Sequence, residues 1–464
     1  PRLAAEYIGQ LNLDRPELQS DLFFWQASPL RKRGALLLFQ AVSDPLRGAH
    51  LEELRAHGLD GLAVAPAAAA DPSLPVFSPR SAAVEPARER PPADALERWL
   101  ARAARDYRDQ RAFWRELFER HGVRLFAGWY THDPAHAAMA DALRDLGGVH
   151  AVYQRSYEGL PSWTTTAATD VQFAWGRHTA GAPAPDGAGP AYTVATGFLG
   201  DHRFAALKPQ ARELRARLEK AGARRVIALF DENSLGDHRW HVGHDRLKLA
   251  YRFILEKVLS DDRLGLIVKP KIARTLRSRL APLDSLLAEA ERTGRCFVFE
   301  GGAIHSSHPP AAAALAADVA VHAYLVAGSA AAEAALAGVP TLLLDHDGFA
   351  ISPLYKLGLG RVVFKEWDPL WRALQEHWSR PDGVPGFGDW SELLPDLDPF
   401  RDGRAAERMG GFLDKTLAAL EGGATREEAM ARAADAYARE WGAAHVWEGP
   451  GARSKAEAGS AERE

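Results

Sequence analysis

Residues 317–345 read ADVAVHAYLVAGSAAAEAALAGVPTLLLD, and this stretch predicts a strand, a loop, a short helix and a second strand. The apolar run 319–321 is short, as in a buried parallel strand. Ser329 is a good helix N-cap residue, and Gly338, followed by Pro340, is typical of a helix end. The order strand–loop–helix–strand indicates a parallel α/β fold.

The loop that ends at Gly328-Ser329 predicts an anion site. Free backbone N–H groups and a hydroxyl at a helix N-terminus suit the phosphates of a nucleotide. Glu333 follows Ser329 by one helical turn, so its carboxylate shares that face and suits ribose hydroxyls. The alternative is an ordinary Ser-capped crossover without a ligand, which is frequent in α/β folds.

Length and composition limit the classes of protein to consider. A chain of 464 residues predicts two domains, and a formal net charge of -4 argues against a nucleic-acid-binding role. Its single cysteine, Cys296, excludes an intrachain disulfide framework and a Cys-based zinc site, so the reducing cytoplasm is the expected compartment. No run of about twenty apolar residues predicts a transmembrane helix.

The first half of the chain alternates between predicted strands and helices. Strands are expected at 34–39, 61–65, 123–130, 149–153, 171–175 and 191–196. Residues 66–95 are rich in Pro and Ala without periodicity and predict a loop or linker. A long helix is expected from 93 to 121, with apolar residues at helical spacing: Leu96, Leu100, Tyr107, Phe113 and Leu117.

The second half repeats this alternation. Strands are expected at 225–230, 264–268, 296–299, 318–321, 341–344 and 361–364, with helices between them. The predicted fold class is therefore α/β, with two doubly wound, Rossmann-like domains that face a cleft. We assign 1–215 to an acceptor-side domain, 216–380 to a donor domain, 381–448 to C-terminal helices that cross back, and 449–464 to a disordered tail.

Residues after the predicted strands of the second half indicate a nucleotide site. Lys269 and Lys271, separated by one proline, could neutralise a diphosphate. Gly301 and Gly302 would let the main chain approach a base or ribose. A solvated loop and an ordinary turn are the respective alternatives.

Several histidines raise the question of a metal site. His238, His241 and His244 are close in sequence, and so are His305 and His308. Their surroundings lack the carboxylates and the spacing of a zinc motif. We therefore expect no bound metal.

Polar residues after the strands of the first half provide candidates for a general base, which an attacking sugar hydroxyl requires. His132, Asp133 and Glu158 are these candidates. Asp133 is better explained as the N-cap of the next helix, so Glu158 is the first choice. Arg155 would suit an anionic acceptor or a lipid phosphate.

Three tryptophans offer flat faces on which sugar rings could stack: Trp129, Trp163 and Trp175. We assign Trp163 to acceptor binding together with Arg155. Scattered core aromatics are the alternative explanation for all three.

The order of these motifs resembles a known family. A strand followed by KPK (269–271), a strand followed by EGG (300–302), and then 317–345 resemble the donor domain of GT-B glycosyltransferases. More narrowly, they resemble bacterial enzymes of capsule, lipopolysaccharide and other surface-polysaccharide biosynthesis. Gln154, TDVQFAWG (169–176) and TVATGF (193–198) are similar to the end of their acceptor domain.

The resemblance implies that the Gly328-Ser329 loop holds donor phosphate and that Glu333 holds the ribose. Lys269-Pro270 stands where related sialyl- and Kdo-transferases and glycerophosphate transferases carry His-Pro, so a cytidine-linked donor is not implied. The fold usually replaces a divalent ion with helix dipoles and basic side chains, so no metal or other cofactor is expected.

The leading hypothesis is a cytoplasmic glycosyltransferase whose partners are a nucleotide sugar and a glycan or lipid-linked glycan acceptor. Contact with the inner face of the membrane or with other assembly enzymes is left open. Two alternatives remain: a hydrolysing nucleotide-sugar 2-epimerase of the same fold, and a non-catalytic two-domain sugar-binding protein.

Overall fold

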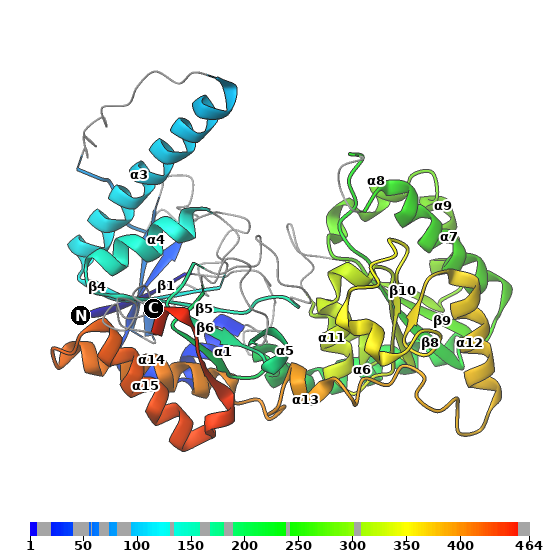
Figure 1. Cartoon of the computed structure of the whole chain (residues 1–464). Helices are drawn as coiled ribbons and strands as arrows, with labels where there is room; N and C mark the ends of the chain where they lie inside the picture. Colours follow the sequence, from blue (N-terminus) through cyan, green and yellow to red (C-terminus); the bar gives the residue numbers. More distant parts are fainter. Residues whose placement is uncertain are drawn as a thin grey trace, which may run out of the picture. The chain divides into compact units, whose positions relative to one another are not determined.

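The computed structural model of the chain consists of two compact units (Figure 1). The described residues are 1–6, 20–39, 55–56, 58–64, 74–80, 94–129, 134–157, 168–180, 189–237, 242–300 and 308–452. The first unit comprises Pro1–Ile8, Asp21–Gly197 and Arg404–Glu464, and the second comprises Gly9–Ser20 and Phe198–Gly403.

The first unit is built on sheet A, whose strand order is β14-β7-β6-β5-β4-β1-β2-β3. Neighbouring strands pair in parallel, apart from the antiparallel pair β14–β7. The strands are β1 (Arg2–Glu6), β2 (Ala35–Phe39), β3 (Leu59–Ala63), β4 (Val123–Gly128), β5 (Val149–Tyr153), β6 (Val171–Ala174), β7 (Tyr192–Ala195) and β14 (Val446–Glu448). The six strands expected from the first half of the sequence are confirmed, whereas β1 and β14 were not predicted.

Helices cover both faces of sheet A (Figure 1). Long helix α3 (Ala95–His121) and α4 (Pro134–Asp145) cover one face, where Trp114 and Leu117 share a core with Leu36. The C-terminal helices α14 (Ala405–Glu421) and α15 (Arg426–Trp441) cover the other face. Phe412 of α14 packs edge-on against Phe173 of β6, with ring centroids 5.5 Å apart. The C-terminal helices therefore belong to the first unit. Smaller elements of this part of the chain are α1 (Ser20–Ala27), η2 (Pro29–Lys32), α5 (Arg177–Ala180), η8 (Ala443–His445) and η9 (Pro450–Ala452).

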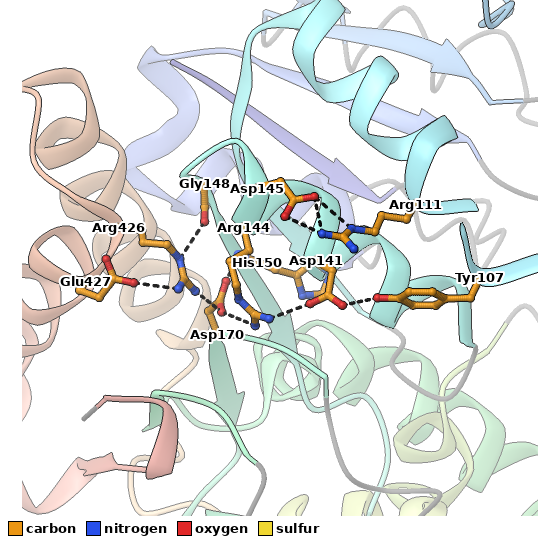
Figure 2. Close-up of polar contacts among 10 residues, drawn as sticks. All are labelled: Tyr107, Arg111, Asp141, Arg144, Asp145, Gly148, His150, Asp170, Arg426 and Glu427. Atoms are coloured by element: carbon orange, nitrogen blue, oxygen red, sulfur yellow. Dashed lines mark hydrogen bonds and ion pairs between the residues drawn. The ribbon is translucent and has the colours of Figure 1, made fainter. Parts of the chain in front are cut away.

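A polar network fastens α15 to the amino-terminal edge of sheet A (Figure 2). Asp170, which directly precedes β6, forms ion pairs with Arg144 of α4 and Arg426 of α15. Its Oδ2 also accepts a hydrogen bond from the backbone N–H of His150 at 2.9 Å. Arg426 further donates to the carbonyl oxygen of Gly148 at 3.3 Å. The buried carboxylate is therefore compensated by two guanidinium groups and one N–H.

The second unit is built on sheet B, whose strand order is β10-β9-β8-β11-β12-β13. Numbered within the unit, this is the order 3-2-1-4-5-6 of a Rossmann sheet. The strands, all parallel, are β8 (Arg225–Phe230), β9 (Leu264–Lys269), β10 (Cys296–Val298), β11 (Val319–His322), β12 (Thr341–Leu344) and β13 (Val363–Phe364). Each of the six strands predicted for the second half is confirmed, with bounds that differ by at most two residues.

Sheet B is covered on both faces. Ile227 and Leu229 of β8 point into one apolar core, and the alternate residues Ala228 and Phe230 point into another. The first core is covered by α7 (His244–Ser260), α8 (Leu276–Leu280), α9 (Asp284–Arg292) and α12 (Trp367–Ser379). The second is covered by α6 (Arg203–Lys220), α10 (Pro310–Ala314) and α11 (Ser329–Leu336). The remaining short elements are η4 (Leu199–His202), η5 (Ala273–Thr275), η6 (Leu325–Ala327), η7 (Pro353–Leu357) and α13 (Leu394–Leu397). The expectation of two doubly wound sheets is confirmed.

Three segments differ from the sequence-based expectation. The units divide after Gly197 instead of near residue 215, because α6 contributes Leu207, Leu214 and Leu218 to a core of the second unit. Phe77, inside the expected loop 66–95, is buried in the core of the first unit. The backbone N–H of Gly449, where the disordered tail was expected to begin, donates to Ala191 at 2.9 Å.

Among the described residues, no helix combines the length and the apolar character that a bilayer crossing requires.

Candidate functional site

The carboxyl-terminal edge of sheet B gathers charged side chains around the point where the strand order reverses, between β8 and β11. Chain segments leave β8 and β11 toward opposite sides of the sheet, and such a switch point is where open α/β sheets bind ligands. Asp231 directly follows β8, and Lys269 is the last residue of the neighbouring strand β9. Both side chains are buried.

Asp231 is the centre of this cluster. The hydroxyl of Tyr251 donates to its Oδ2 at 3.0 Å, and the backbone N–H of Lys271 donates to its Oδ1 at 2.6 Å. The Arg279 guanidinium lies 3.7 Å from Oδ2. Burial raises the pKa of Asp231 to about 6, although Arg279, the N–H and the phenol all favour the charged form. Asp231 is therefore protonated more readily than an exposed aspartate.

Lys269 is a buried cation beside this carboxylate. Burial lowers its pKa from the ordinary 10.5 to about 8, and the nearby carboxylates of Asp231 and Glu333 limit the fall. Its Nζ donates to the carbonyl oxygen of Pro270 at 3.2 Å. A buried ammonium group with a lowered pKa would gain from an anionic ligand, because the added negative charge favours the protonated form.

Lys271, two residues further, reaches toward solvent. Its side chain is half exposed and forms an ion pair with buried Glu232. Oε1 of Glu232 also accepts a hydrogen bond from the backbone N–H of Asn233 at 2.8 Å. Lys269 and Lys271 therefore lie at the same strand end, as the sequence predicted, and the structure adds that Lys269 is buried and Lys271 is half exposed.

Two buried polar atoms at this edge lack a partner among the described residues. They are the hydroxyl of Tyr324, which follows β11, and Oδ1 of Asp345, which follows β12. The other carboxylate oxygen of Asp345 accepts a hydrogen bond from Tyr355. Buried polar groups are nearly always satisfied, so unsatisfied ones beside a switch point favour a ligand site.

The loop predicted to bind phosphate leads into α11, but the capping differs from the prediction. The helix begins at Ser329, and Gly328 occupies the N-cap position without a side-chain cap. The first helical hydrogen bond runs from the N–H of Ala332 to the carbonyl oxygen of Gly328 at 2.8 Å. Ser329 as N-cap is therefore wrong by one position. Its hydroxyl still lies at the helix start, where the dipole favours an anion.

Glu333 has a structural contact that the sequence did not reveal. Its Oε1 accepts a hydrogen bond from the backbone N–H of Ala311, in the first turn of α10, at 3.0 Å. Burial raises its pKa, while Arg203, the Ala311 N–H and Lys269 oppose the shift. The structure thus brings Glu333 near Lys269, and a ribose hydroxyl would have to share the carboxylate with α10.

Six predicted site residues lie outside the described residues: four on the acceptor side and the two glycines that follow the strand 296–298. They are His132, Asp133, Glu158, Trp163, Gly301 and Gly302. Arg155 is described and exposed, two residues after β5. Trp129 and Trp175 are buried, so for these two the core alternative is correct.

The histidines are placed only in part. His238, His241 and His305 lie outside the described residues. His244 contacts the hydroxyl of Ser234 through Nδ1 at 2.9 Å, and the ring of His308 packs on Phe299 with centroids 4.8 Å apart. Over the part of the chain that the structure describes, no three His, Cys, Asp or Glu side chains gather as metal ligands would.

Sequence reasoning missed several polar residues. Arg279 on α8 donates to Ser234 at 3.3 Å and to the Ile272 carbonyl oxygen at 3.0 Å, but nothing in LRSRL signals this role. In the first unit, β1 ends at Glu6, beside β4 and at the corresponding reversal of strand order. Glu6 Oε2 accepts a hydrogen bond from the N–H of Trp129 at 3.2 Å. If β1 had been predicted as a strand, Glu6 would have been identified as a polar residue at its carboxyl-terminal end.

Comparisons with known proteins identify the fold. No family model matches the sequence, and no curated protein sequence matches it. A Listeria monocytogenes protein assigned as a UDP-N-acetylglucosamine 2-epimerase has a similar structure, with a TM-score of 0.53 at 12% identity over 90% of this chain and 96% of that chain. This likeness establishes a GT-B-type fold, with two Rossmann-like units and C-terminal helices.

Two other solved structures are less similar. MnaA from S. aureus, solved with UDP, gives a TM-score of 0.49 at 9% identity over 90% of this chain and 97% of that chain. The α,α-trehalose 6-phosphate synthase of Burkholderia multivorans gives 0.48 at 14% identity over 91% and 98%, respectively.

Proposed function

We propose that this protein is a glycosyltransferase that moves a sugar from a nucleotide-activated donor to a growing surface glycan or glycolipid. The observation that carries the proposal is buried Lys269 beside the switch point of a Rossmann sheet in a GT-B-type fold. A cation in a water-poor environment stabilises the negative charge that develops on a departing diphosphate more strongly than the same group in water.

The donor would bind along the carboxyl-terminal edge of sheet B. Lys269 and Lys271 neutralise the phosphates, and the N-terminus of α11 at Gly328-Ser329 adds backbone N–H groups and a hydroxyl. Glu333 contacts the ribose, and Gly301 and Gly302 allow the main chain to approach the nucleoside. The hydroxyl of Tyr324 and Oδ1 of Asp345, both without a partner among the described residues, are further contacts for the bound donor.

The acceptor would bind to the first unit. Glu158 is proposed as the general base that deprotonates the attacking hydroxyl, with Asp133 and His132 as the other candidates. Arg155 and Trp163 would hold the acceptor through an anionic group and a sugar face. The proposal uses no metal ion, since basic side chains and a helix dipole provide the positive charge.

A nucleotide-sugar 2-epimerase is the second candidate, because the structure with a TM-score of 0.53 is assigned to that class. The two reactions differ in their need for an acceptor. An epimerase converts its donor when no acceptor is present, whereas a transferase releases nucleotide in proportion to the glycan it extends.

The first experiment is a thermal-shift screen with UDP-, GDP-, CMP- and CDP-linked sugars, followed by calorimetric titration of those that stabilise the protein. Ser329→Ala and Lys269→Ala should weaken donor binding by about tenfold or more without unfolding the protein. Ser285→Ala, at an exposed position on α9, is the matched control. A screen in which no nucleotide stabilises the protein would remove the main support for the proposal.

Product analysis then separates the two candidate reactions. Incubation of the donor alone, followed by NMR of the sugar, detects epimerisation. Glu158→Gln should abolish glycosyl transfer and leave donor affinity unchanged. Transfer retained in Glu158→Gln would exclude Glu158 as the base.

A further inference from the structure

His322 ends β11 at the switch point of sheet B. Its side chain is 1% exposed, and its ring lies 6.3 Å from the ring of Phe230, measured between centroids. The backbone N–H of Tyr324 donates a hydrogen bond to Nδ1 of His322 at 3.1 Å. Because a backbone N–H can only donate, Nδ1 is the acceptor, and the proton of the neutral ring is on Nε2.

The ring of His322 is uncharged at neutral pH. Burial lowers its pKa to about 4, while Glu232 opposes the shift and Lys271 adds to it. These two neighbours also form an ion pair with each other. No described residue accepts a hydrogen bond from Nε2 of His322. This buried ring therefore has one N–H group that a ligand could satisfy.

The register of sheet B places His322 on the same face as Lys269. His322 is aligned with Phe230 on β8, and Phe230 is aligned with Lys269 on β9. Aligned residues of neighbouring strands point to the same face of a sheet, and here it is the face of the core that contains Phe230. The backbones of His322 and Lys269 are about 10 Å apart, since they are two strand spacings from each other. The edge of sheet B therefore presents a cation and a neutral N–H group on one face.

His322 also begins the loop that leads to the expected anion site. The segment from His322 to Ser329 connects the last residue of β11 to the first residue of α11. A phosphate oxygen can only accept hydrogen bonds, so it matches a ring nitrogen that can only donate. A sugar hydroxyl could accept the same bond, but only a phosphate would also gain from the charge of Lys269 on the same face.

We propose that His322 binds the nucleotide of the donor site by donating its Nε2–H to a phosphate oxygen. The inference rests on the proposed function, because it requires a nucleotide at the edge of sheet B. Nδ1 of the same ring holds the start of the loop through the N–H of Tyr324. One side chain therefore has a structural contact on one nitrogen and a ligand contact on the other.

Two substitutions separate these contacts. In His322→Asn the side-chain oxygen replaces Nδ1 as the acceptor of the Tyr324 N–H, and nothing replaces Nε2. In His322→Gln the amide nitrogen replaces Nε2 as a donor, and the contact with Tyr324 is lost. His322→Asn should keep the melting temperature of the wild type and bind the nucleotide about tenfold or more weakly. His322→Gln should bind within about threefold of the wild type and melt a few degrees lower.

The test is calorimetric titration of the full chain with UDP, GDP, CDP and CMP and with inorganic pyrophosphate. Pyrophosphate has neither base nor ribose, so its affinity should fall together with that of the nucleotide in His322→Asn. Histidine-selective 15N labelling gives a second readout, which a structural role alone would not change. The signal that is missing from His322→Asn should show the Nε2–H tautomer, and its Nε2 resonance should move when the nucleotide binds.

The matched control is His377→Asn. His377 lies on α12, and its Nδ1 also accepts a backbone hydrogen bond, from the N–H of Val384 at 2.9 Å. Its ring packs on Phe387, with centroids 4.3 Å apart. Since His377 shares the Nδ1 contact but not the position at a strand end, His377→Asn should bind nucleotide and pyrophosphate like the wild type.

Four results would overturn the inference and leave the proposed function standing. They are equal nucleotide affinity in the wild type and His322→Asn, an equal loss in His377→Asn, an Nδ1–H tautomer at His322, and weaker nucleotide binding in His322→Asn with unchanged pyrophosphate binding. The last result would assign Nε2 to the base or the ribose. A wild-type protein that binds no nucleotide would overturn the inference and the proposed function together.

Discussion

Two buried aspartates illustrate how differently the two sheets use their edges. Asp170 precedes β6 at the amino-terminal edge of sheet A and has two arginine partners and a backbone N–H (Figure 2). Asp231 follows β8 at the carboxyl-terminal edge of sheet B, with one guanidinium at 3.7 Å, a phenol and a backbone N–H. Burial raises the pKa of Asp231 to about 6.

The difference distinguishes a structural contact in the first unit from the proposed donor site in the second unit. Around Asp170, the carboxylate and both arginines are neutralised by ion pairs within the fold. These contacts attach α15 to the sheet. Around Asp231 the fold keeps a buried lysine with a lowered pKa and a buried tyrosine hydroxyl that has no partner among the described residues. Buried polar groups without partners lower the stability of a fold, and a ligand that satisfied them would offset this cost, which supports the proposed donor site.

The largest expected change in folding stability is at Asp170. Asp170→Ala should destabilise the first unit by about 3 kcal/mol, because it removes the buried carboxylate that Arg144 and Arg426 share, although Asp141 and Glu427 remain as their partners, and it removes the acceptor of the His150 N–H. Asp60→Ala, at an exposed ion pair with Arg2, should cost at most about 1 kcal/mol. Urea denaturation measures both. Equal losses would show that burial does not distinguish these two pairs.

The next effect has the opposite sign. Lys269→Met should stabilise the second unit by roughly 1–3 kcal/mol, because a buried ammonium with a lowered pKa is replaced by an apolar side chain of similar length. The same variant should lose affinity for the nucleotide. Lys208→Met, at an exposed position on α6, should change neither property. A destabilised Lys269→Met would mean that the ammonium supports the fold.

The same lysine sets an expected pH dependence. Its folded pKa of about 8 lies below the ordinary 10.5, so folding stability should rise as pH rises from about 8 toward 10.5. Nucleotide affinity should move the other way and fall by up to about tenfold per pH unit above 8, as the cation is lost. Titration calorimetry across this range measures the effect. Lys269→Arg should remove the dependence, and a persistent slope in that variant would assign it to another group.

The smallest expected effects come from two buried tyrosines of the second unit, Tyr251 and Tyr324. Tyr251→Phe removes a hydrogen bond to Asp231 and should cost about 1 kcal/mol. Tyr324→Phe removes a buried hydroxyl without a partner among the described residues, so the free protein should be as stable as the wild type or slightly more stable. Donor affinity should fall in Tyr324→Phe. A loss of stability equal to that of Tyr251→Phe would indicate a partner in the free protein.

The strands of sheet B could be predicted because buried parallel strands are continuous apolar runs, as in RVIALF and TLLL. β1 and β14 escaped prediction since RLAAE is weakly apolar and VWE is a three-residue edge strand. The helical spacing of Leu96, Leu100 and Leu117 correctly predicted one continuous helix. Periodicity does not indicate where the covering core ends, and Leu96 and Leu100 are exposed.

The site was predictable only where it follows strands directly. Lys269 and Lys271 come at the end of an apolar run, so their position at the sheet edge follows from the topology. Tyr251 and Arg279 reach Asp231 from helices elsewhere in the chain, which no local pattern reveals. The contact of Glu333 with α10 was missed for the same reason, because spacing within α11 describes one helix only.

Hydrogen exchange with and without a nucleoside diphosphate, monitored by mass spectrometry, tests the central claim most directly. Binding should protect peptides at the ends of β8, β9 and β11, around Asp231, Lys271 and Tyr324. Peptides around Asp170 at the amino-terminal edge of sheet A should exchange unchanged. Protection confined to the first unit, or no protection by any nucleotide that binds, would contradict a donor site on sheet B.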